Sequence, residues 1–171
     1  MNYAMSSGLI LGLFWVIKYV VVVGAEQIPF LRVFTAALMF VTPLLLLYFL
    51  VRYRTQETGG TLRFTHGLQF TIMLFFFASI LEAVVVYIHI TWIDTAFVGN
   101  MYAEMVAALK QLNFAGQMAE TLGNEPIPSG LYYIINHVVL TNVFAGMMLS
   151  LFLIPLSKRL NVRHFNLRKS E

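Results

Sequence analysis

Four long apolar segments run through this chain of 171 residues. They cover about residues 5–25, 30–51, 64–90 and 131–156. A helix needs roughly 20 mostly apolar residues to cross a bilayer, because hydrocarbon offers no partners to the backbone and the helix must satisfy its own hydrogen bonds. The sequence therefore predicts an all-α polytopic membrane protein, with four transmembrane helices in a single membrane domain, 1–171.

The composition excludes an ordinary soluble domain. Hydrophobic residues make up 59% of the chain and charged residues 11%, whereas soluble domains have about 45–50% and about 25%. The absence of cysteine excludes disulfides, thiolate metal sites and cysteine nucleophiles. A net charge of +3 is too small for a nucleic-acid-binding surface. We therefore expect the lipid bilayer, and no nucleic acid, as a partner.

Positive charges gather on one side of the predicted bundle. Eight lie between the second and third segments or in the basic tail, 157–171: Arg52, Arg54, Arg63, Lys158, Arg159, Arg163, Arg168 and Lys169. On the opposite side only Lys110 lies well clear of the membrane. Loops rich in lysine and arginine stay in the cytoplasm, so we expect both termini to be cytoplasmic. Arg52 and Arg54 could also hold anionic lipid headgroups together with the tail.

The segment 94–125 is too polar to span but shows helical periodicity. Apolar residues recur at spacings of three or four along one face: Phe97, Met101, Met105, Leu109 and Leu112. Asp94 with Thr95 is the expected N-cap, and a break is expected near 113–116. This extracytoplasmic amphipathic segment either lies on the membrane or caps the bundle, or it forms a lid or a docking face for a partner.

Five ionisable residues fall within the predicted spans and form a candidate intramembrane polar cluster: Lys18, Arg32, Glu82, His89 and His137. Such residues cost about 2.5–3.5 kcal/mol at a helix centre on insertion scales, so each needs a partner or has a function. By sequence position all five lie in the outer half of the membrane. Glu82 and His89 are seven residues apart and therefore share one helix face.

Two interpretations of this cluster stay open. Glu82 could pair with Lys18 and orient two helices, or the cluster could line an outward polar cavity that binds a lipid headgroup or an ion, or relays protons. Glu82, His89 and His137 could also converge, but zinc needs three or four converging ligands, and no spacing here favours a site. We therefore predict no metal and no cofactor.

Small residues mark the helix-packing surfaces. Gly8 and Gly12 have GxxxG spacing in the first span, and Gly146 and Ser150 have the same spacing in the fourth. Small residues allow helix backbones to approach closely, which matters because lipid provides no hydrophobic drive between helices. We expect these surfaces to pack within the bundle, with a second copy or another membrane protein as the alternative.

The third span and the residues after it form a recognisable pattern. Trp92-Ile93-Asp94 ends the span, a methionine-rich amphipathic segment follows, and the fourth span carries FAGMMLSL before the basic tail. Over nearly its whole length the chain resembles a family of four-span inner-membrane proteins of Bacteroidota that is known only as a domain of unknown function. The resemblance implies a bacterial inner (cytoplasmic) membrane and carries over no functional residue. Family members are often encoded near glycosyltransferases resembling those that load polyprenyl phosphate, which implies such an enzyme as a partner.

Three functions are weighed against these observations: an accessory subunit, a small transporter or channel-like protein, and an intramembrane enzyme. The chain contains no P-loop, no dinucleotide-binding glycine motif, no HExxH and no GxSxG, so we do not predict an enzyme. An accessory or interaction subunit of a membrane-envelope assembly is the main prediction, and a small transporter or channel-like protein using the polar cluster is the alternative. An intramembrane enzyme would need a nucleophile or metal beside Glu82 and a histidine, and the sequence does not place one.

Overall fold

The computed structural model describes residues 2–28, 30–112 and 115–160, except for the side chains of residues 26, 27 and 32. The long helices are α1 (Asn2–Gln27), α2 (Leu31–Gln56), α3 (Phe64–Ile88) and α7 (Thr141–Arg159). Short π-helical turns extend two of them: η1 (His89–Ile93) continues α3, and η2 (Ile134–Leu140) joins α6 (Gly130–Tyr133) to α7. Between these long segments lie α4 (Phe97–Lys110) and α5 (Gly116–Asn124).

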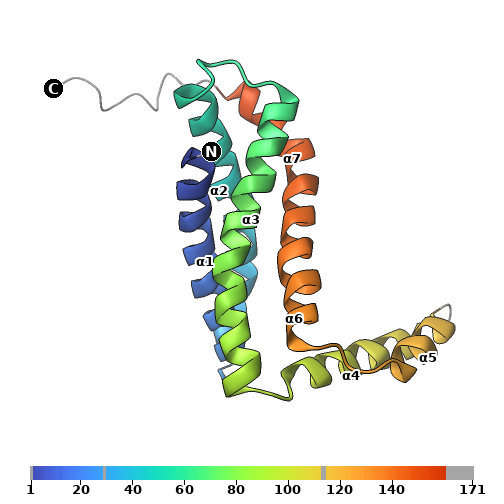
Figure 1. The fold of residues 1–171 in the computed structure, drawn as a ribbon. Helices are drawn as coiled ribbons and strands as arrows, with labels where there is room; N and C mark the ends of the chain where they lie inside the picture. Colours follow the sequence, from blue (N-terminus) through green and yellow to red (C-terminus); the bar gives the residue numbers. More distant parts are fainter. Residues whose placement is uncertain (1, 29, 113–114, 161–171) are drawn as a thin grey trace.

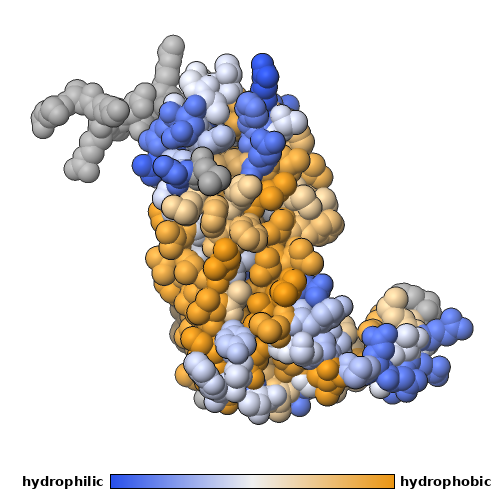
Figure 2. Space-filling model, viewed as in Figure 1, coloured by the Kyte–Doolittle hydropathy of each residue, from blue (hydrophilic) through white to orange (hydrophobic). Residues whose placement is uncertain are grey.

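Four continuous helical stretches are long and apolar enough to cross a membrane. They are Asn2–Ala25, Val33–Gln56, Phe64–Ile93 and Gly130–Arg159. On the face that Figure 2 shows, an apolar band covers the bundle, with polar residues at its two ends. Val33, Met39 and Phe40 are each more than 70% exposed (71%, 73% and 72%), as expected of side chains that face lipid. The predicted all-α fold with four spans is confirmed, and the chain is an integral membrane protein.

The four long helices form one bundle (Figure 1). α1 packs most extensively against α3, α3 also packs against α7, and α2 contacts α1 and α7. Trp15 and Phe75 meet edge to face in the core, with ring centroids 5.1 Å apart, and Leu46 and Ile154 are fully buried in the same cluster. Close packing and dispersion hold these helices together, since lipid tails are as apolar as the core.

The small residues lie where helices approach most closely. A Cβ atom added at Gly8 would lie 2.8 Å from the carbonyl oxygen of Leu74, and one at Gly12 would lie 2.9 Å from that of Ala78. At Gly146 the added atom would lie 2.6 Å from Cγ of Phe75. Ser150 is fully buried and donates to the Met147 carbonyl at 2.6 Å. These surfaces are therefore used inside the bundle.

One end of the bundle, which we call the basic end, holds the start of α1 and the end of α7. Tyr3 packs against Tyr53 and Phe70, with ring centroids 6.0 and 5.8 Å apart. Arg54 is buried and donates to the carbonyl oxygens of Ser157, at 2.5 Å, and Leu160, at 2.8 Å. A cation there complements the partial negative charge at a helix C-terminus. Arg54 thus caps α7, so the lipid headgroup role considered for it is replaced by a structural one.

The basic tail is described only as far as Leu160. α7 extends to Arg159, beyond the predicted end of the fourth span at residue 156. Arg163, Arg168 and Lys169 lie outside the described residues.

The other end of the bundle carries an arm, formed by α4, α5 and the chain that returns to α6 (Figure 1). The arm corresponds to the predicted amphipathic segment. The Asp94 carboxylate accepts a hydrogen bond from the Ala96 N–H at 3.1 Å, but α4 begins only at Phe97. α4 ends at Lys110 and α5 begins at Gly116, so a break between two helices is present where it was predicted.

Candidate functional site

The structure gives the residues of the predicted polar cluster separate partners. Glu82 and His89 are both buried in the third span, with 8% and 7% of their surface exposed. His137 lies in η2 and is exposed. Arg32 lies in the first turn of α2, but its side chain lies outside the described residues.

The partner of Glu82 is an amide. Asn142 on α7 donates from Nδ2 to Oε2 of Glu82 at 2.6 Å. Among the side chains that the structure describes, no ion pair joins Glu82 to Lys18. The Nζ of Lys18 instead lies 5.9 Å from the centroid of the Trp15 ring, one turn earlier on α1. Of the two interpretations of Glu82, direct pairing with Lys18 is therefore replaced by a hydrogen bond that joins α3 to α7.

Asn142 was not among the predicted site residues, because it shares the α7 face of Gly146 and Ser150. That face packs against α3, where Gly146 meets Phe75. A polar residue on a packing face is itself a signal, since an unpaired amide in hydrocarbon is costly. Asn142 precedes Gly146 by one turn, and Glu82 follows Phe75 by two turns, which places the two residues within about one turn of each other in depth.

His89 is held between α1 and α4. The Tyr19 hydroxyl and His89 Nδ1 form a hydrogen bond of 2.6 Å. The Phe97 ring meets His89 edge to face at 5.2 Å. His89 is the first residue of η1, and single π-helical turns within α-helices occur frequently at functional sites. His89 therefore fixes the start of the arm to the bundle.

His137 makes the matching contact on the last span. Its ring stacks on Tyr133 with centroids 5.1 Å apart, and its Nε2 and the Tyr102 hydroxyl form a hydrogen bond of 3.2 Å. The Tyr133 hydroxyl donates to the sulfur of Met101 at 3.5 Å. Two histidines on two π-helical turns thus both contact α4, His89 at Phe97 and His137 at Tyr102.

No metal centre is formed in the part of the chain that the structure describes. No group of three histidine, aspartate or glutamate side chains there could hold a metal ion. Glu82 bonds to α7, His89 to α1, and His137 to α4. The convergence of these three residues that the sequence left open is therefore not observed.

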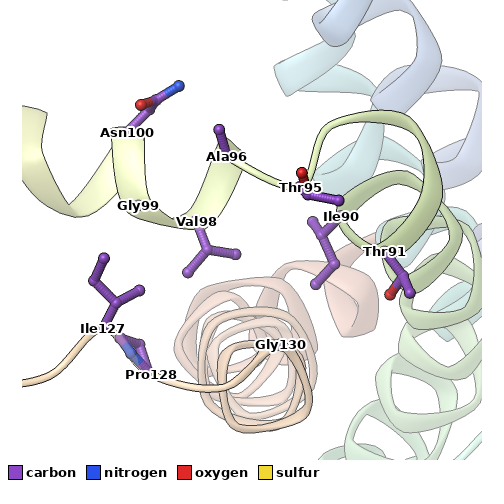
Figure 3. A pocket seen from close by; sticks show the side chains of 10 residues that line it. All are labelled: Ile90, Thr91, Thr95, Ala96, Val98, Gly99, Asn100, Ile127, Pro128 and Gly130. Carbon is purple, nitrogen blue, oxygen red and sulfur yellow. The ribbon is translucent and has the colours of Figure 1, made fainter.

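A groove runs along the arm beside α4. Its first part, at the root of the arm, is a cleft of about 670 Å³ that Figure 3 shows from close by. Ile90 and Val98 point into this cleft and Ile127 points toward α4, whereas Asn100 lies at the rim and points away. No charged residue lines this part.

The groove continues toward the tip of the arm. A second cleft of about 400 Å³ lies between α4 and α5 and shares Gly99 and Ile127 with the first. Lys110 and Glu125 lie beside it. Tyr102 also lines this cleft, so the residue that bonds His137 connects the polar contacts at the root to the groove.

Comparison with known proteins gives one match. No curated protein and no solved structure matches the chain significantly. A family model described as "Protein of unknown function (DUF4199)" matches residues 6–156. The match includes all four spans and the arm. Residues 6–156 are most of the sequence, so the chain belongs to the DUF4199 family of proteins of unknown function.

Proposed function

We propose that this protein is an accessory subunit of an envelope assembly in the bacterial inner membrane, and that it contacts another membrane protein through the groove along its arm. The groove carries this proposal. It combines clefts of about 670 and 400 Å³ on a part of the chain that stands outside the bundle. The small-residue surfaces are occupied within the bundle, so the arm is the described surface best suited to a partner.

The shape and lining of the groove suit a short peptide segment. Small residues of α4 line it at helical spacing, namely Gly99, Ala103 and Ala107. Its described lining is uncharged near the bundle, and Lys110 and Glu125 offer one charge of each sign near the tip. A segment with an apolar side chain at one end and a polar group at the other would satisfy both parts.

The distribution of charge supports an orientation for this contact. Arg52, Arg63, Lys158 and Arg159 flank the spans at the basic end, and by the positive-inside rule they favour a cytoplasmic location for that end. The arm then lies on the extracytoplasmic side of the membrane, and both termini lie on the cytoplasmic side. The family resemblance suggests a glycosyltransferase that acts on polyprenyl phosphate as the first partner to test.

The experiment is gentle purification from the native host in nanodiscs, with mass spectrometry of every chain that accompanies the protein. Gly99→Leu fills the groove, because a Cβ atom there already lies 3.5 Å from Cδ1 of Ile127. Gly116→Leu is the matched control, because no atom lies within 4 Å of its added Cβ and it lines neither cleft. We expect a stoichiometric partner with the wild type and Gly116→Leu, and its loss with Gly99→Leu. A partner retained by Gly99→Leu, or a wild type that purifies alone, contradicts the proposal.

A small transporter is the second candidate, and the environment of Glu82 favours it. This carboxyl group is buried at membrane depth and bonds to a neutral amide. Buried ionisable groups within spans mark proton or ion pathways in many transporters. Glu82→Gln keeps an oxygen for Asn142 to donate to but cannot exchange a proton. If Glu82→Gln abolishes the protein's function in the cell while the abundance of the protein is unchanged, the result supports transport. If the variant functions as the wild type does, the result supports the accessory role.

A further inference from the structure

The arm leaves the bundle where the apolar band ends. Its two roots are the ends of spanning helices, because Asp94 follows η1 and Gly130 begins α6. Figure 1 shows α4 and α5 running across the direction of the bundle helices. Since spanning helices follow the membrane normal to within a moderate tilt, the arm runs along the membrane surface.

One face of α4 points toward the membrane side of the arm. Phe97 and Met101 pack against the bundle cluster that contains Val86 and Tyr133. Met105 and Leu109 continue the same stripe at spacings of four, farther along the arm. Residues four apart lie on one helix face, so the stripe that begins on the bundle continues over the neighbouring lipid.

The rest of the arm has the same division into two sides. Apolar side chains remain exposed at Leu112 (44%) and Met118 (60%). On α4, Asn100 and Glu104 are exposed away from the apolar stripe. Figure 2 shows polar residues gathered along the lower edge of the arm, the edge farther from the apolar band.

Aromatic residues mark the depth of the arm. Trp92 is 72% exposed at one root and Tyr132 is 58% exposed at the other. Exposed tryptophan and tyrosine are enriched at the boundary between lipid tails and headgroups, where their rings are both apolar and polar. Both roots of the arm therefore lie at headgroup level.

We infer that the arm is an interfacial hairpin that lies on the lipid leaflet at its end of the bundle, with the apolar stripe buried among the headgroups and upper acyl chains. The net charge of the arm determines which type of lipid headgroup it lies against. Residues 94–125 contain four acidic residues and only one basic residue, Lys110. A net negative arm is repelled by anionic headgroups, so its surface partner is a zwitterionic leaflet. This inference concerns the membrane side of the arm and does not depend on the proposed partner in the groove.

The absence of native cysteine allows a direct test, because any introduced thiol carries the only label. Leu112→Cys and Met118→Cys are spin-labelled in phosphatidylcholine nanodiscs, and collisions with oxygen are compared with collisions with a water-soluble nickel chelate. Met39→Cys on the lipid-facing side of α2 and Glu57→Cys in an exposed turn set the two limits. Glu104→Cys is the matched position on the polar side of the arm.

We expect Leu112→Cys and Met118→Cys to give an oxygen-to-nickel ratio near that of Met39→Cys, and Glu104→Cys a ratio near that of Glu57→Cys. Replacing part of the phosphatidylcholine with phosphatidylglycerol should move the first two ratios toward the aqueous limit. Aqueous ratios at Leu112 and Met118 in phosphatidylcholine would overturn the inference. Low collision rates with both reagents would also overturn it, because they would show that protein, such as a second copy, covers the face. Deeper burial in anionic lipid would overturn the assigned headgroup preference.

Discussion

Glu82 and Asn142 form one interaction between side chains 60 positions apart in the chain. A carboxyl group that loses its donor inside a membrane protein keeps its desolvation cost without the compensating bond. Asn142→Ala should therefore lower the free energy of unfolding by about 1–3 kcal/mol, the usual penalty for leaving a buried polar group unsatisfied. The measurement is unfolding in mixed micelles with increasing denaturing detergent.

Asn136→Ala is the control for this prediction. Its amide donates only to the Tyr132 carbonyl of its own helix, in an exposed bond of 3.0 Å. The double variant Glu82→Leu/Asn142→Leu should recover most of the lost stability, because replacing both partners with apolar groups removes the unpaired one. An Asn142→Ala variant as stable as Asn136→Ala would show that the bond contributes nothing.

At the scale of the element, the approach of α1 to α3 depends on glycine. A Cβ at Gly12 would lie 2.9 Å from the Ala78 carbonyl oxygen and 2.8 Å from Cδ1 of Leu81. The carbonyl belongs to a helix backbone and cannot rotate away, so the two helices must separate. Gly12→Ala should cost about 1–3 kcal/mol, as overpacking of a well-packed core does.

Gly24→Ala, on the same helix, tests whether the effect is steric. Its added Cβ would lie 3.4 Å from Cδ1 of Leu31, an ordinary contact, and alanine is the better helix former. Thermal unfolding in nanodiscs should rank Gly24→Ala with the wild type and Gly12→Ala below both. Equal stability of the two variants would mean that the helices adjust without cost.

At the scale of the whole molecule, the asymmetry of charge predicts the orientation in the membrane. In spheroplasts, a membrane-impermeant maleimide should label Glu120→Cys on the arm and leave Glu57→Cys at the basic end unlabelled until lysis. Both positions are exposed in the structure, so labelling reports the side of the membrane rather than burial. Labelling of Glu57→Cys in intact spheroplasts would reverse the topology and place the arm in the cytoplasm.

The spans could be predicted from sequence because the requirement for them is local. Any stretch of roughly 20 apolar residues in hydrocarbon must close its own backbone hydrogen bonds, whatever its neighbours are. The periodicity from Phe97 to Leu109 and the spacings of Gly8 with Gly12 and of Gly146 with Ser150 likewise show which residues share a face. These patterns were sufficient to predict the helices, the amphipathic segment that forms the arm, and the residues at which two helices approach each other closely.

The partners of the polar side chains could not be predicted in this way. Lys18 and Glu82 have similar depths by sequence, but a pair also requires both helices to be rotated toward each other. The rotation is decided by packing, through Gly12 against Ala78 and Gly146 against Phe75, and it turns Asn142 toward Glu82. The groove has the same origin, since Gly99 and Ile127 meet only after the chain has turned back along α4. The sequence alone determined what must enter the membrane, because the transfer of each segment depends on that segment. The tertiary structure decided which side chains meet, because contact depends on the rotation, depth and spacing of two segments at once.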